Sequence, residues 1–361
     1  MINDTANWTY EKEPTVLDDS VEYLLNEYRA RQFWERRSYR EAMAEAAEAA
    51  LKAHDMGDSQ GFWRMSLLKA ECQVELGLMR EFALEAKLLV EDEKIAGDPA
   101  IKARATALYA RALQCLGQVG ESLRVAKEAA AIELANSVEI SSHFDTRHAL
   151  IASLADSGRL VEAWDVAESL LDLVNEETPP EAAGLAYWSV GNVAFLMENN
   201  VEGAKWHDEA AIYLSPSNDV YLWAQFNKAS AHVRLAANLM EPATLECIER
   251  AELAISVSGG SPMDEMELAL VRSHWLLLTG EYAESLQRLE EVLDDRDLLS
   301  PPILAEAEQL IAMALMELGR IDDALDSARR SEKMFIVLGA TRMADVSREL
   351  IDKIESKIDN S

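Results

Sequence analysis

One short pattern recurs about every forty residues along this chain of 361 residues. It combines a helical-looking apolar segment, a glycine and, five residues after the glycine, a small side chain. The clearest copies carry the glycine at Gly77, Gly117, Gly158, Gly280 and Gly319. In the other copies its place is taken by Arg37, Asn199 and Asn238. A repeat of this length is typical of solenoids, in which each unit buries its apolar face only against its neighbours.

Apolar residues around each glycine recur at spacings of three and four, as in the run Ala163, Val166, Ala167, Leu170. This is helical periodicity, and no convincing strand accompanies it. Prolines behind a polar residue mark predicted helix starts at Asp98-Pro99, Thr178-Pro179-Pro180, Ser261-Pro262 and Ser300-Pro301. Each unit is therefore expected to contain a helix A, a tight turn at the glycine, a helix B and a looser turn. Eight such units predict about sixteen helices.

Three segments follow from where the pattern begins and ends. Residues 1–16 are polar and lack periodicity, which predicts a loose N-terminal arm. Residues 17–339 are the predicted repeat array. In residues 340–361, Met343, Val346 and Leu350 share one face of a predicted helix. Such a C-terminal capping helix would cover the apolar edge of the last repeat.

The charge of the chain excludes some classes of partner. Its 65 acidic and 34 basic side chains give a net charge of −31, which repels phosphate backbones and anionic lipid surfaces. We therefore expect no direct binding to nucleic acid or membrane. Three widely spaced cysteines indicate free thiols in a reducing compartment, and no signal peptide precedes the repeats. The predicted localisation is cytoplasmic.

No pattern of residues indicates an enzyme. The sequence has no glycine-rich phosphate loop, no His-Glu-x-x-His and no Cys-x-x-Cys. His143 and His148 are five residues apart, so they would point about 140° apart around a helix, which is poor geometry for a metal site. We predict a protein without catalytic residues, cofactor or metal.

The repeats resemble those of the tetratricopeptide-repeat family. The segments Gly280-Glu-Tyr-Ala-Glu-Ser285 and Gly319-Arg-Ile-Asp-Asp-Ala324 match its turn most closely. The unit here is longer than the 34 residues of that family, and it is similar to the repeat arrays of bacterial transcription regulators. The resemblance implies an all-α solenoid of about eight helix-turn-helix repeats, in which helix A lines a concave groove.

In that family the positions about six, ten and thirteen residues before the glycine face the groove. The basic side chains and histidines at these positions are Arg31, Arg64, Arg104, Arg111, His148, Lys228, His232 and His274. Because guanidinium groups suit carboxylates, one hypothesis is a groove that holds an acidic or C-terminal carboxylate group. The alternative is that these cations pair with acids on adjacent helices.

The sequence therefore predicts a non-catalytic scaffold that binds a protein or peptide in its groove. A first alternative is a ligand- or peptide-sensing regulatory protein of the transcription-regulator lineage that lacks its own DNA-binding domain. A second alternative is an acidic decoy for a basic DNA-binding protein. The oligomeric state stays open at this level.

Overall fold

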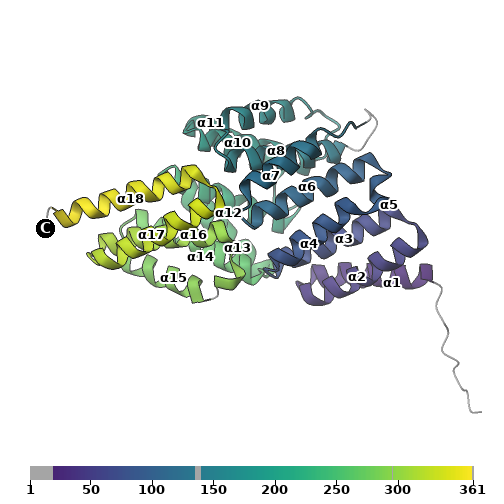
Figure 1. Ribbon diagram of the computed structural model, residues 1–361, viewed down its shortest axis with the longest axis horizontal. Helices are drawn as coiled ribbons and strands as arrows, with labels where there is room; N and C mark the ends of the chain where they lie inside the picture. The colour runs from purple at the N-terminus through teal and green to yellow at the C-terminus, as the bar shows by residue number, and fades with distance from the viewer. Residues whose placement is uncertain (1–18, 135–139, 295, 360–361) are drawn as a thin grey trace, which may run out of the picture.

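The computed structural model describes residues 19–134, 140–294 and 296–359, and within these ranges all regular secondary structure is helical (Figure 1). The predicted arm at residues 1–16 lies outside the described residues. No helix in the described ranges is both long and apolar enough to span a bilayer.

Paired helices make up most of the described chain, and each pair is one repeat unit. The eight hairpins are α1 (Asp19–Glu35) with α2 (Tyr39–Met56), α3 (Ser59–Glu75) with α4 (Met79–Glu91), α6 (Pro99–Cys115) with α7 (Val119–Ala130), α8 (Ile140–Asp156) with α9 (Leu160–Leu171), α10 (Pro180–Leu196) with α11 (Asn200–Tyr213), α12 (Val220–Ala236) with α13 (Pro242–Ser258), α14 (Pro262–Leu278) with α15 (Tyr282–Asp294), and α16 (Pro301–Glu317) with α17 (Ile321–Leu338). The short α5 (Glu93–Ala96) and η1 (Arg296–Leu298) lie in connections.

The first helix of every hairpin has the same length of 17 residues. Each first helix ends in the same turn, in which a residue with positive φ is followed by one whose N–H bonds back five residues, as from Leu78 N–H to the Gln73 carbonyl at 2.8 Å. This bond satisfies a carbonyl that the helix end leaves unpaired. The constant length of the first helix and the shared geometry of the turn together produce the fixed period in the sequence.

The predicted turn residue is wrong in the fifth unit. Glu198 has the positive φ of 62°, and Asn199 is instead the residue that precedes α11. The turn was predicted at Asn199 because asparagine tolerates the left-handed backbone better than glutamate does. With Glu198 as the turn residue, the small side chain five residues later is the buried Gly203, which contacts Phe195.

Helix starts follow the predicted proline pattern in three of four places. The Asp98 carboxylate accepts hydrogen bonds from the Ala100 and Ile101 N–H groups, and Ser261 forms a reciprocal capping box with Asp264. Ser300 precedes α16 without a side-chain capping bond. At α10 the residue before the helix is Pro179 and not Thr178.

Small side chains allow the helices of each hairpin to approach closely. Small side chains at three positions of the repeat, seven residues before the turn residue and five and nine after it, are fully buried in most units, namely Ala30, Ala42, Ala46, Ala70, Ala86, Ala110, Ala126, Ala163, Ala167, Ala231, Ala312, Ala324 and Ala328. Ala243 is exposed, because α13 begins two residues later than in the other units and Thr244 is buried in its place. Beyond the hairpins, α18 (Thr341–Asp359) packs on α17, and its Leu350 and Ile354 join the apolar cluster of the last two units.

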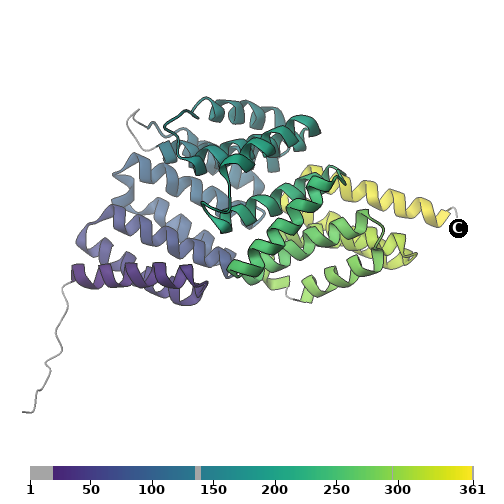
Figure 2. The same ribbon diagram turned by 180° about the vertical axis from the view of Figure 1, so that it is seen from behind.

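The solenoid winds so tightly that successive superhelical turns touch. Arg37 in the first unit stacks on Tyr221 at the start of the sixth, α3 of the second unit contacts α14 of the seventh, and Gly117 in the third lies against Leu338 of the eighth. Each contact joins units five apart, so one superhelical turn takes about five units. Figures 1 and 2 accordingly show the C-terminal units, in green and yellow, beside the N-terminal units in purple and blue.

Candidate binding channel on the concave surface

The first helices of consecutive units contact one another along the inner side of the solenoid, as α6 does α8, α10 does α12, and α14 does α16. The curvature is strong enough for His232 on α12 to reach past the seventh unit. Its Nδ1 atom lies 3.4 Å from the Glu306 carboxylate on α16. The inner side of the solenoid is therefore strongly curved, and the term channel refers below to this concave surface, to which the predicted register assigns its side chains.

Four of the five predicted channel cations are paired with acids of the chain itself. Arg31 and Arg64 both approach the Glu27 carboxylate, at 2.8 and 3.7 Å, and Arg64 also donates to the Tyr23 hydroxyl at 2.9 Å. Arg104 donates to Asp145 of the next unit at 2.7 Å. The contacts of Arg64 and Arg104 agree with the alternative in which the basic residues pair with adjacent helices, whereas Arg31 pairs within its own helix.

Lys228 is the most buried of the predicted site residues. Its ammonium group donates to Asp264 at 3.0 Å and to Glu267 at 2.6 Å, both on α14 of the next unit. Burial by itself would lower the pKa of Lys228, but the attraction of these two carboxylates raises it above its ordinary value. Lys228 is thus an internal link between the sixth and seventh units, and it is not available to a ligand.

Arg111 differs from the other four cations. Among the described residues it makes no ion pair and no hydrogen bond, and its side chain is exposed. Its charge nevertheless acts on three neighbours, Glu71, His148 and Cys115. Burial raises the pKa of Glu71, and Arg111 offsets part of that rise. Burial lowers the pKa of His148, and Arg111 lowers it further. The guanidinium group therefore lies near these side chains inside the channel.

The three predicted histidines occupy different environments. His148 shares a hydrogen bond of 2.8 Å with the Ser189 hydroxyl of the next unit. His274 lies near His232, and burial followed by the charge of His232 lowers its pKa to about 3. A histidine with that pKa is neutral at physiological pH. No described atom forms a hydrogen bond with the buried Nδ1 atom of His274.

Sequence reasoning missed the polar seam where the superhelical turns meet. The Tyr221 hydroxyl at the start of α12 donates to the Glu75 carboxylate at the end of α3. Arg37 stacks over the Tyr221 ring at 4.5 Å from its centroid. Glu75 and Tyr221 are 146 residues apart, and no signal in the sequence connects them.

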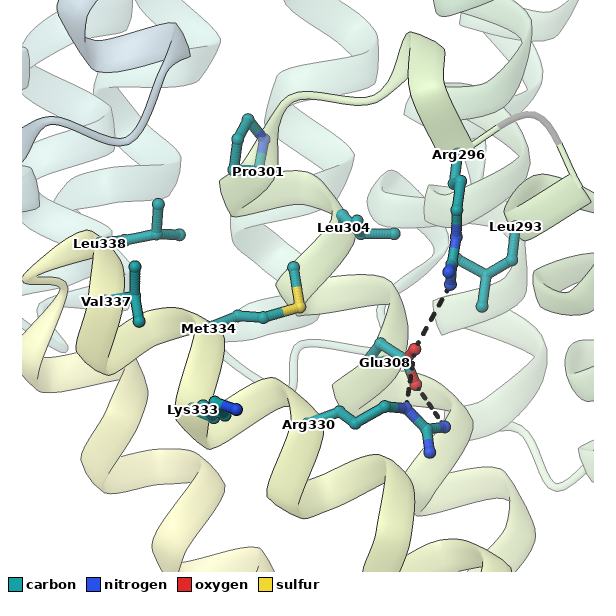
Figure 3. Close-up of a pocket in the computed structure, with 10 residues that line it drawn as sticks. All are labelled: Leu293, Arg296, Pro301, Leu304, Glu308, Arg330, Lys333, Met334, Val337 and Leu338. Carbon is teal, nitrogen blue, oxygen red and sulfur yellow. Dashed lines mark hydrogen bonds and ion pairs between the residues drawn. The ribbon is translucent and has the colours of Figure 1, made fainter.

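A pocket lies among side chains of α15, η1, α16 and α17 (Figure 3). It has a volume of about 670 Å³. Its apolar lining includes Leu304, Met334 and Val337, and its wall carries an ion pair in which both Arg330 and Arg296 approach the buried Glu308 carboxylate. None of the predicted site residues lines this pocket.

The chain matches no protein-family model and no curated protein sequence. Among solved structures it is similar to the APC/C hetero-tetramer Cut9–Hcn1, with a TM-score of 0.56 and 13% identity over 90% of this chain and 55% of that one. It also matches a Rap protein complexed with Competence and Sporulation Factor (TM-score 0.47, 17% identity, 95% of this chain and 78% of that one). A third match is the apo form of RapI (TM-score 0.43, 12% identity, 94% of this chain and 100% of that one). At these identities the similarity concerns the fold, and the Cut9–Hcn1 match confirms the predicted tetratricopeptide-like α-solenoid.

Proposed function

We propose that this protein is a non-catalytic scaffold that binds a protein or peptide in its concave channel, and that Arg111 holds a carboxylate of that partner. The observation that carries the proposal is the unpaired state of Arg111. The other four channel cations are engaged by acids of the chain, whereas Arg111 has donors to offer and no described acceptor. A guanidinium group in such a position accepts a carboxylate through two parallel hydrogen bonds.

The surroundings of Arg111 favour a carboxylate over a phosphate. Asp145, Glu71 and Glu267 lie on neighbouring parts of the channel, and the whole chain carries a charge of −31. A dianionic phosphate would meet twice the repulsion that a single carboxylate meets. A C-terminal carboxylate or one acidic side chain of a peptide is the ligand group that this balance of charge allows.

The fold supports a binding role. In the Cut9–Hcn1 structure a helical-repeat chain of this kind is part of a hetero-tetramer. Solenoids expose extended concave surfaces to partners because the small rotation from each repeat to the next accumulates into a curvature. The channel here has the same origin, since the first helices of consecutive units contact one another along one side.

Binding of a library of fluorescent peptides with free or amidated C-termini tests the proposal. We expect a subset of peptides to bind, and we expect the substitution Arg111→Glu to weaken that binding more than tenfold, a loss of at least about 1.4 kcal/mol. Amidation should weaken the same peptides when their terminal carboxylate is the bound group.

Arg124→Glu is the matched control, since Arg124 belongs to the same hairpin but lies exposed on α7, paired with Glu121 and Glu128. It should leave the affinity unchanged. Equal affinity of wild-type protein and the Arg111→Glu variant for every bound peptide would contradict the role of Arg111.

A further inference from the structure

The pocket shown in Figure 3 has an apolar part and a cationic part. Its apolar lining consists of Leu293, Pro301, Leu304, Met334, Val337 and Leu338. The ion pairs of Glu308 lie at one end of the pocket, and Val337 and Leu338 lie at the other (Figure 3). The volume of about 670 Å³ falls within the range of about 300–1,000 Å³ that is usual for small-molecule sites.

The buried Glu308 carboxylate in the wall is already neutralised by one of its two arginine neighbours. The Nε and Nη2 atoms of Arg330 donate to its two oxygens at 3.0 and 2.8 Å. The Nη2 atom of Arg296 lies 3.8 Å from the same carboxylate, which is beyond hydrogen-bond distance. Because one cation balances one carboxylate, the charge of Arg296 is left over.

Lys333 supplies a second cation without an acid partner. One face of α17 carries, at helical spacing, Arg330, Lys333, Met334 and Val337, and all four line the pocket. The Lys333 side chain is exposed and makes no ion pair or hydrogen bond with any described residue. Asp326 acts on Arg330 but does not line the pocket. The described lining therefore has three cations and one carboxylate, a net charge of +2 in a chain whose net charge is −31.

This combination of charge and apolar surface defines the ligand that fits. A local excess of positive charge attracts anions and repels cations. Val337 is 78% exposed although it is apolar, so an apolar group placed against it and Met334 would remove apolar surface from water. The strong negative charge of the whole chain disfavours a ligand with several negative charges.

We infer that this pocket binds a small amphipathic anion, whose apolar body lies between Leu304 of α16 and Met334 of α17 and whose anionic head group lies beside Arg296 and Lys333. The site is separate from the proposed peptide site, since none of the predicted channel residues lines it. Either site can therefore fail its own test without affecting the other.

Isothermal titration calorimetry of the full chain with three decyl compounds tests the ligand class. Decanoate, decanol and decyltrimethylammonium share an apolar body and carry a negative, a neutral and a positive head group. Below its micelle concentration decanoate should bind saturably, with one site per chain. Decanol should bind at least about tenfold more weakly, because it lacks charge-assisted hydrogen bonds, and decyltrimethylammonium should not bind. No saturable binding of decanoate, or equal affinity for decanoate and decanol, would overturn the inference.

Charge reversal at Lys333 tests where the head group lies. Lys333→Glu should weaken decanoate binding by about tenfold or more and should leave decanol binding nearly unchanged. Lys353→Glu is the control, because it changes the net charge of the chain equally at an exposed residue of α18 that does not line the pocket. It should leave both affinities unchanged. Equal effects of the two substitutions would mean that only the overall charge matters, and would overturn the inference.

Two neighbouring residues of α17 test where the apolar body lies. Val337 and Ile336 are 78 and 55% exposed, and of the two only Val337 lines the pocket. Val337→Asp should weaken the binding of decanoate and of decanol, because it places a charge against the apolar body. Ile336→Asp should weaken neither, and circular dichroism should show that both variants stay folded. A folded Val337→Asp variant that binds decanoate as the wild type does would overturn the inference.

Discussion

At the scale of single residues, the contact between superhelical turns depends on a buried carboxylate. Burial raises the pKa of Glu75 above its ordinary value, and the hydrogen bond from Tyr221 offsets only part of this rise. One carboxylate oxygen has no described hydrogen-bond partner. The folded protein therefore holds a proton on Glu75 more tightly than the unfolded chain does.

This pKa shift predicts how stability changes with pH. The contribution of Glu75 is fully present below its unfolded pKa of about 4.5 and is lost as pH rises through the higher folded pKa. Glu75→Gln keeps an acceptor for Tyr221 without the charge. We expect the variant to be more stable than the wild type at pH 8, with a difference that shrinks as pH falls toward 5. Urea unfolding at several pH values measures this, and a difference independent of pH would contradict the shift.

Tyr221→Phe separates the hydrogen bond from the charge. It removes the donor to Glu75 and leaves the carboxylate buried with one partner fewer. The expected cost is about 1–3 kcal/mol in the free energy of unfolding at neutral pH, the penalty of an unsatisfied buried group. In the Glu75→Gln background the cost should be smaller, which a double-mutant cycle measures.

The candidate site was only partly predictable from its residues. Arg104 and Asp145 are one repeat apart, so the period places them side by side, and their ion pair follows. Lys228 with Glu267 follows in the same way. Which cation stays unpaired was not predictable, because that depends on the acids that the curvature brings across the channel. In the sequence Arg111 could not be distinguished from the other four predicted channel cations. Only the structure shows which of the five lie beside a carboxylate of the chain.

At the scale of helices, side-chain capping bonds distinguish two helix N-termini whose sequences are similar. Asp98 and Ser300 both stand before a proline, yet only Asp98 accepts backbone hydrogen bonds. Asp98→Ala should lower the free energy of unfolding by about 1 kcal/mol. Ser300→Ala is the control and should cost less, since no capping bond is lost. Equal losses in thermal or urea unfolding would show that the capping bonds contribute nothing measurable.

Helix boundaries were predicted well where the residue at the turn is of a type that favours positive φ. The turns at Gly77 and Gly319 lie where glycine stands, because glycine adopts positive φ without steric cost. The fifth turn was misplaced by one residue because Glu198 adopts positive φ, a conformation that glutamate rarely takes. There the packing of α10 against α11 determines the turn and overrides the local preference of the residue.

At the scale of the whole molecule, the closed superhelix depends on contacts between units five apart. Gly117 and Gly158 are equivalent turn residues with φ of 69° and 74°. A side chain at Gly117 would meet Leu338 of the last hairpin, whereas nothing lies within 4 Å of one at Gly158. This pair of glycines distinguishes the strain of a turn from the contact between superhelical turns.

Gly117→Asn and Gly158→Asn test that contact. Asparagine tolerates positive φ, so the backbone cost is small and similar in both variants. Gly117→Asn should lower the free energy of unfolding by a further 1–3 kcal/mol or so, as overpacking does, and should increase the radius of gyration in small-angle scattering. Gly158→Asn should leave the radius unchanged. Identical behaviour of the two variants would mean that Leu338 does not help to close the superhelix.

The sequence alone determined the repeat, the helices and their small-residue contacts, because all of these depend on interactions within one unit or between neighbours about forty residues apart. A periodic pattern records such local interactions directly. Only the tertiary structure decided the five-unit superhelical turn, the seam at Glu75 and Tyr221, and which of the five predicted channel cations has no acid partner among the described residues. These depend on small rotations between units that accumulate along the solenoid, and no individual repeat encodes the sum.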